Sequence, residues 1–512
     1  MVLLLFFLLL PLGQAAAAPV SASIPLDSWI YPAIDKLAGL GLIDSALQGS
    51  RPFSRHEAAR LTREALDQAE VTAPAPVALE ILRRLEGELQ TSLREVAGSS
   101  APGYIQPLRE IRLDYLHQEG VPSVIASRPP GGTLDLIDAR QFALDPNNFG
   151  LDYDEGHNGR VILETEARLG SFLLFNWRPL LLVGEEGDTS LRTLHGTATL
   201  GLGRWQVSAG RESLWWGQGR RGSLILTSNA APLEMLRITN PTPVLLPWIF
   251  RPLGPFRLDL FWSRLESDRL IPEPYLAGLR MNIKPRPWLE LGASRTVMFG
   301  GEGRPDVGFS DFFTILGGKN LEGGEDTSNQ LAALDARLKI PPLAGAELYG
   351  EWGGEDEAGG FISHKSWIAG LYLPQLEPTG RLALRLEYAD LTHESGVAPA
   401  WYRHGIYRSG YTYKGKVLGH HIGGAARNLY TELEARLSGS WTVRGSFDYQ
   451  ERGTDQLVEE THRQPAVEVE WEVRPGLTIS AAYALDRVKN FGFTAGDSRD
   501  FHLLRAGVAA HW

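Results

Sequence analysis

Apolar and polar residues alternate with a period of two through most of the chain after about Leu108. In one such stretch Val467, Val469 and Trp471 alternate with Glu468 and Glu470. Successive side chains of a β-strand point to opposite faces, so each stretch predicts a strand with one apolar and one wet face. The same alternation occurs at residues 161–168, 193–200, 205–212 and 441–450.

The connections between these stretches fall into two classes, short turns and long loops. Short turns, such as those at Gly170, Gly203 and Pro475-Gly476, alternate with long loops, such as 119–159, 300–328 and 392–427. Short turns at one end and long loops at the other are typical of outer-membrane β-barrels, and a terminal aromatic residue such as Trp512 suits the membrane–water interface. We therefore expect an all-β transmembrane barrel of about 18 antiparallel strands in residues 101–512, with the strand between Trp215 and Phe256 the least defined.

A soluble propeller or sandwich is the competing fold. Its packed sheets would have to bury Glu468, Glu470 and Glu472, which share one face of a strand. Burial of unpaired carboxylates is costly, so this alternative is disfavoured.

The N-terminal part of the chain has a different pattern. Residues 2–12 are an apolar run followed by small residues, which predicts a signal peptide over residues 1–22. Residues 23–100 contain three apolar stripes at helical spacing, and Ser54 and Glu57 form a capping-box pattern. We expect a small three-helix bundle. An even strand number places both ends of the barrel in the periplasm, beside this bundle.

Composition narrows the functions available. The chain has no Cys, which excludes disulfides, thiolate metal sites and a Cys nucleophile. A net charge of −11 argues against a nucleic-acid partner. Gly217–Gly222 matches G-x-G-x-x-G, but the following Ser223–Leu226 looks extended rather than helical, so we reject a nucleotide site. We expect no catalytic residues, no metal ligands and no cofactor.

The stretch Trp215–Phe250 is too apolar for a solvated loop and too irregular for one strand. We predict that it folds inward as a plug. A plugged lumen disfavours the alternative function, a porin or substrate channel, although 18 strands could enclose an aqueous lumen.

A basic, aromatic loop at Trp401–Arg427 is the strongest binding candidate. It contains no Asp or Glu in a chain that is acidic overall. Aromatic faces stack on sugar rings, and guanidinium groups pair with carboxylates. An alternative is that the loop folds into the lumen and pairs with carboxylates there. The candidate polysaccharide-binding residues are Trp215, Trp216, Arg220, Trp401, Tyr402, Arg403, His404, Tyr407, Arg408, Tyr411, Tyr413 and Lys414.

Three motifs in this order resemble the Wzi-type capsule assembly proteins. They are RPFSRHEAARL at Arg51–Leu61, WWGQGRRGSLILTSNAAP at Trp215–Pro232 and YRHGIYRSGYTYKGKVLGHHIGG at Tyr402–Gly424. The resemblance implies an 18-stranded barrel, a periplasmic helical bundle, a lumen closed by extracellular segments, and attachment of capsular or exopolysaccharide rather than catalysis. The expected partners are an anionic surface polysaccharide, outer-membrane lipid and the polysaccharide export machinery.

Overall fold

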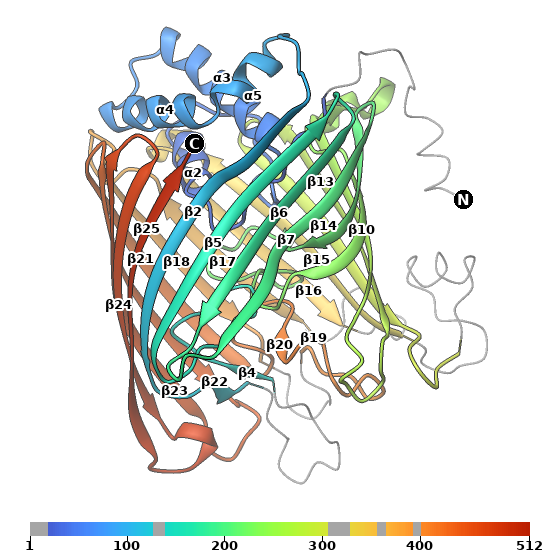
Figure 1. Cartoon of the computed structure of the whole chain (residues 1–512). Helices are drawn as coiled ribbons and strands as arrows, with labels where there is room; N and C mark the ends of the chain where they lie inside the picture. Colours follow the sequence, from blue (N-terminus) through green and yellow to red (C-terminus); the bar gives the residue numbers. More distant parts are fainter. Residues whose placement is uncertain (1–18, 126–138, 306–327, 356–364, 393–400) are drawn as a thin grey trace.

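A closed antiparallel β-barrel forms most of the chain, and helices cover one of its ends (Figure 1). The computed structural model describes residues 19–125, 139–305, 328–355, 365–392 and 401–512. The predicted signal peptide therefore lies almost wholly outside the described residues. We call the end of the barrel that carries the helices the helix end and the opposite end the loop end.

The barrel has 18 strands when β10 and β11, which both pair with β12, are counted as one interrupted strand. This confirms the predicted fold class. The strands are β2 (Tyr104–Glu119), β5 (Gly156–Leu169), β6 (Leu173–Val183), β7 (Thr189–Leu202), β8 (Trp205–Glu212), β10 (Leu233–Thr239), β11 (Val244–Leu245), β12 (Pro255–Arg264), β13 (Tyr275–Arg286), β14 (Leu289–Phe299), β15 (Ser328–Ile340), β16 (Ala346–Glu355), β17 (Ser366–Leu373), β18 (Leu382–Asp390), β21 (Ala426–Ser438), β22 (Trp441–Arg452), β23 (Glu460–Arg474), β24 (Leu477–Lys489) and β25 (Ser498–His511).

The last strand closes the barrel on the first. β25 pairs with β2 from Glu110↔His511 to Glu119↔His502. Along most of each strand, polar residues face the lumen and apolar residues face outward, except where lumen-facing apolar residues such as Met235 and Phe261 join the buried cluster inside the barrel. In β13, Arg280 and Asn282 are buried, whereas Met281 between them is 41% exposed. This alternation is the physical basis of the period-two pattern in the sequence.

Among the described residues, four helices precede the barrel: α2 (Ile30–Gly39), α3 (Arg55–Val71), α4 (Pro76–Glu88) and α5 (Gln90–Val96). The expectation of three helices was wrong because the third apolar stripe breaks at Leu89, which divides it into α4 and α5. None of the described helices is long and apolar enough to cross a membrane.

The predicted capping box is half formed. Ser54 Oγ accepts a hydrogen bond from the Glu57 backbone N–H at 3.1 Å. The Glu57 carboxylate accepts from the guanidinium of Arg60 at 2.7 and 2.8 Å. The Glu57 carboxylate therefore pairs with the charge of Arg60 and does not complete the capping box.

The helical domain is fixed to the barrel by ion pairs and by a short strand. Arg381 lies 2.7 Å from Glu80, and Arg178 lies 2.9 Å from Asp27. β1 (Ser50–Arg51) enters the lumen and pairs with β9 (Trp215–Trp216). The remaining short elements are β3 (Ser123–Val124), β4 (Arg140–Gln141), β19 (Thr412–Tyr413), β20 (Lys416–Val417) and the 3-10 helices η1 (Trp248–Leu253), η2 (Pro341–Leu343) and η3 (Phe491–Phe493).

Candidate functional site

Two loop-end segments fold into the lumen and pack on each other. The segment 213–232 contributes Trp216 and Leu224, and the segment 401–425 contributes Tyr402 and Leu418 to the same buried cluster. The Tyr402 hydroxyl donates a hydrogen bond to the Leu224 carbonyl at 2.7 Å and accepts one from the His420 N–H at 2.8 Å. We call these two segments together the plug.

Carboxylates on the barrel wall hold the plug. Glu351, in β16, accepts hydrogen bonds from the Gly219 and Leu224 N–H groups at 2.8 and 2.9 Å. Glu387, in β18, accepts from the Arg220 and Arg221 N–H groups at 2.7 and 2.8 Å. Four backbone N–H groups of the plug thus find acceptors on two wall residues, and buried N–H groups need such partners, so these contacts fix the plug backbone.

The glycine motif at Gly217–Gly222 allows this close approach. A Cβ on Gly217, whose φ is +143°, would lie 2.2 Å from the Glu351 carboxylate, and one on Gly222 would lie 2.3 Å from the His420 ring. No helix follows the motif, in agreement with the rejection of a nucleotide site. The glycines make room for Glu351 and His420.

The predicted plug Trp215–Phe250 was right for its first half and wrong for its second. Leu233–Thr239 is the barrel strand β10, paired with both β8 and β12. Farther along, Trp248 and Ile249 are 78% and 81% exposed. Both lipid and a packed lumen favour apolar residues, so apolarity alone could not separate these environments.

The candidate aromatic residues of the loop are part of the plug core. Trp401, Tyr402, Tyr407, Tyr411 and Tyr413 are all buried, as is His404. The Tyr411 hydroxyl donates to Thr296 Oγ1 at 3.0 Å, and the Tyr407 hydroxyl donates to the Gly300 carbonyl at 3.1 Å. These rings pack within the protein, as the alternative of a loop folded into the lumen predicted.

The basic residues of the loop divide into two groups. Arg403 and Lys416 are buried and pair with Asp455 and Asp152 at 2.7 and 2.5 Å. Arg408 and Lys414 are exposed. Within the described part of the chain, neither of these two has a carboxylate at ion-pair distance. Arg427, at the end of the loop, is partly exposed but pairs with Asp390 and Glu451, both at 3.6 Å.

The three remaining candidate residues lie away from the exposed side chains of Arg408 and Lys414. Trp215 and Trp216 are buried beside β1, and the Arg220 side chain lines a cavity of about 290 Å³ at the helix end. The structure therefore does not bring Trp215, Trp216 and Arg220 together with Arg408 and Lys414.

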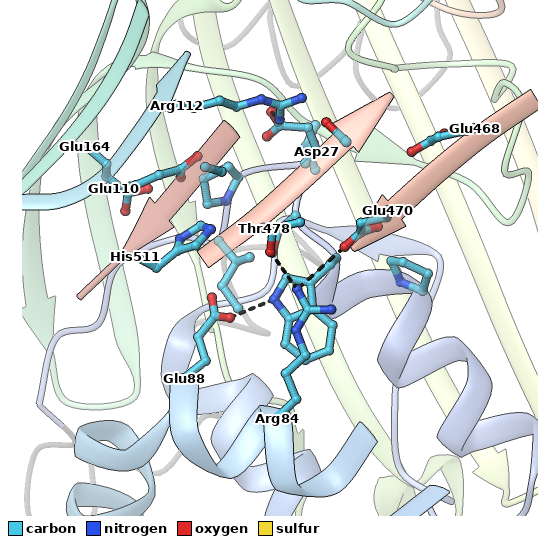
Figure 2. A pocket seen from close by; sticks show the side chains of 18 of the residues that line it. Asp27, Arg84, Glu88, Glu110, Arg112, Glu164, Glu468, Glu470, Thr478 and His511 are labelled. Carbon is cyan, nitrogen blue, oxygen red and sulfur yellow. Dashed lines mark hydrogen bonds and ion pairs between the residues drawn. The ribbon is translucent and has the colours of Figure 1, made fainter. Parts of the chain in front are cut away.

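Figure 2 shows the helix-end cavity, which lies between the helical domain and the barrel wall. The Arg84 guanidinium stacks on the Trp29 ring at 3.8 Å and lies 3.5 Å from Glu470. Trp29 Nε1 donates to Glu88 at 2.6 Å. Arginines and carboxylates alternate around the cavity and pair with each other, so its lining has no strong excess of either charge.

Sequence reasoning missed the carboxylates of the barrel wall that accept hydrogen bonds from the plug, among them Glu290, Asp335, Glu351, Glu355, Glu387 and Asp448. They lie on the lumen-facing sides of strands that carry many other charged residues, and nothing in their spacing distinguishes them from those residues. Glu290, for example, accepts a hydrogen bond from the Gln218 side-chain amide of the plug at 3.1 Å, and it also accepts the Gln48 and Gly49 N–H groups, both at 2.9 Å. Only the folded chain reveals which carboxylates meet backbone donors.

The fold and plug define a membrane-spanning β-barrel of the outer membrane whose lumen is occupied by its own loops. The family described as "Capsule assembly protein Wzi" matches residues 128–503, and the chain belongs to this family.

Individual proteins are similar to the chain in sequence or in fold. The chain is 34% identical over 171 residues to an "uncharacterized 55.8 kDa protein in cps region" of Klebsiella pneumoniae; the match covers 32% of this chain and only 33% of that protein's length. The structure superposes with a TM-score of 0.71, at 19% identity, on Escherichia coli Wzi, covering 96% of this chain and 99% of that one. That protein is described as a carbohydrate-binding β-barrel involved in group 1 capsule assembly. Pseudomonas aeruginosa OprD reaches only 0.46 at 10% identity, covering 80% and 95% of the two chains.

Proposed function

We propose that the chain retains an anionic capsular or exopolysaccharide at the cell surface through the loop end of its barrel. Membership of the capsule assembly family and the carbohydrate binding of the E. coli relative support this proposal. The observation that carries it is the exposure of Arg408 and Lys414 on a loop whose other parts are fixed in the plug.

The loop end then faces outward, and the helical domain lies in the periplasm. Two features support this orientation: a signal peptide predicted at residues 1–22, which would direct export, and the first and last barrel strands, since β2 begins and β25 ends at the helix end (Figure 1). The domain division is residues 23–100 for the helical part and 101–512 for the barrel. In the periplasm the helical domain could reach the export machinery.

In the proposed mechanism, many weak contacts with one polysaccharide chain add up to stable retention. An exposed ion pair contributes about 0–1 kcal/mol, so Arg408 and Lys414 alone would hold one sugar carboxylate only loosely. A polysaccharide presents the same charged unit repeatedly, and repeated engagement raises the overall affinity. The buried Tyr407, Tyr411 and Tyr413 position the two cations by fixing the loop.

Cells that carry an Arg408→Ala/Lys414→Ala variant test the proposal. We expect the variant to reach the surface at the parent's level and to release polysaccharide into the medium, because the loop loses its exposed charges but keeps its buried contacts. Cell-bound and released uronic acid are the quantities to measure.

The matched control is Arg286→Ala/Arg474→Ala, which removes two exposed cations from helix-end turns. This control should retain polysaccharide as the parent does. Equal retention by the Arg408/Lys414 variant and the parent would show that the loop serves only as a plug.

A further inference from the structure

The segment Val244–Leu253 lies on the outer face of the barrel. The next strand, β12, shows which residues face the lumen and which face outward at this point of the barrel wall. Arg257 points into the lumen, where its guanidinium donates to the Ser50 and Pro52 carbonyls at 3.1 and 2.9 Å. Since side chains alternate along a strand, Phe256 and Leu258 point outward.

These two outward residues are covered. Phe256 and Leu258 are 4% and 5% exposed, whereas the outward Trp262 of the same strand is 36% exposed. Leu246 packs on both, with Val244 and Leu253 beside it. The segment therefore covers the outside of the barrel wall at the helix end.

The opposite side of this segment is apolar and exposed. Leu245 is 57% exposed, Trp248 78% and Ile249 81%. Between Leu233 and Arg257 the chain carries Glu234, Arg237 and Arg251 as its only charged residues, and Arg251 is the one that lies within the segment. Exposed apolar side chains grouped in this way mark an interaction surface.

The surroundings of the segment identify its partner. It packs against Leu279 and Ile283 of β13, and these residues share the outward face of that strand with Met281, which is 41% exposed. A Trp beside an Arg suits the headgroup region, where an apolar body meets a charged tip. Pro247 and Pro252 have no N–H, so this irregular backbone brings fewer unpaired donors toward the hydrocarbon.

We infer that Val244–Leu253 is a membrane anchor that lies in the phospholipid headgroup region at the helix end, with Trp248 and Ile249 inserted toward the acyl chains. The anchor widens the apolar surface of the barrel on one side, so it biases the direction in which the barrel tilts relative to the bilayer normal. This inference depends on the fold and is independent of polysaccharide binding.

The absence of Cys allows a direct test with single spin labels. Ile249→Cys carries a nitroxide, and the labelled protein is reconstituted in phosphatidylethanolamine–phosphatidylglycerol vesicles. Power saturation compares collisions with oxygen, which concentrates in the bilayer, and with a water-soluble nickel chelate. Met281→Cys reports the lipid-facing wall, and Arg474→Cys reports a turn in water.

We expect the label at position 249 to collide with the nickel chelate several-fold less than the label at 474, and with oxygen nearly as often as the label at 281. Nickel accessibility equal to that at 474 would overturn the inference. Protection from both reagents would also overturn it, because the segment would then be covered by protein, such as a second copy of the chain. Gel migration before and after heating verifies that each labelled barrel is folded.

Discussion

The carboxylate of Glu351 lies 2.8 Å from the backbone nitrogen of Gly219, so a side chain of the barrel wall holds the plug from within the lumen. The same carboxylate accepts hydrogen bonds from the Leu224 N–H and the Ser223 hydroxyl at 2.9 and 3.0 Å. One wall residue thus satisfies two backbone donors of a segment that has no helix or wide sheet of its own, and it is a second acceptor for the Ser223 hydroxyl, which also donates to the Trp216 carbonyl. The closure of the lumen depends on such wall-to-plug contacts.

Replacement of Glu351 by Ala should loosen the plug. Each buried donor left without an acceptor costs about 1–3 kcal/mol, and the variant leaves two, the Gly219 and Leu224 N–H groups, because the Ser223 hydroxyl can still donate to the Trp216 carbonyl. In planar-bilayer recordings we expect the parent to show no large, steady conductance and Glu351→Ala to show frequent openings.

Glu468→Ala is the control for this measurement, since Glu468 lies on β23, is half exposed and pairs with Arg444 at 3.3 Å. It should behave as the parent does. Large, steady conductance from the parent protein would favour the porin alternative, and a closed Glu351→Ala barrel would show that other contacts hold the plug.

Acidification should destabilise the plug at His420. Burial lowers the pKa of His420 to about 3, and the positive charge of Arg221 acts in the same direction. Below its ordinary pKa of 6.5 the unfolded chain binds a proton that the folded chain excludes. The free energy of unfolding therefore falls as the pH drops from 6.5 toward 3.

The measurement is the temperature of heat-modified gel migration at pH 7.5 and 5. We expect the parent to lose more stability between these pH values than His420→Gln, which cannot take up the proton. Equal losses in the two proteins would show that His420 does not couple the plug to pH.

The attachment of the helical domain should also depend on pH, in a lower range. Burial alone would raise the pKa of Glu95, but hydrogen bonds from Arg168 and His56 lower it to about 2. The ionised carboxylate stabilises docking fully above the ordinary pKa of 4.5, and this contribution is lost as the pH falls through about 2.

Pepsin cleavage of the helices between pH 4.5 and 2 measures this loss. The parent should become steadily more susceptible as the pH falls, while Glu95→Gln should be cleaved readily throughout. Glu86→Gln changes an exposed glutamate of α4 and corrects for the pH dependence of pepsin itself. Identical cleavage of all three proteins would contradict the role of Glu95.

The barrel could be predicted from the sequence because its two faces meet different solvents. Lipid favours apolar residues such as Val467 and Leu504, and the lumen accepts Glu468 and Glu470, so apolar and polar residues alternate along most of the barrel strands. No such alternation of apolar and polar residues marks the plug. Trp216, fully buried in the lumen, and Trp248, 78% exposed outside the barrel, belong to one apolar stretch, and only strand pairing separates them.

The roles of residues in the loop Trp401–Arg427 also could not be predicted from residue type alone. The aromatic and basic residues of Trp401–Arg427 suit sugar contact and also suit a buried core with internal ion pairs. Tyr411 and Arg403 take the second role, and Arg408 and Lys414 are left on the surface. Burial, which depends on contacts between distant segments such as Tyr402 and Leu224, decides between the roles.

Binding of purified protein to an immobilised polyuronate, compared with the same polymer after reduction of its carboxyl groups, tests the proposed function most directly. We expect the parent to bind the polyuronate, to bind the reduced polymer several-fold less, and to lose binding as salt rises from about 0.05 M to about 0.5 M, because screening shortens the range of exposed charges. Arg408→Ala/Lys414→Ala should bind both polymers equally weakly. If the parent does not distinguish the two polymers, or if the variant binds the polyuronate as well as the parent does, the proposal is wrong.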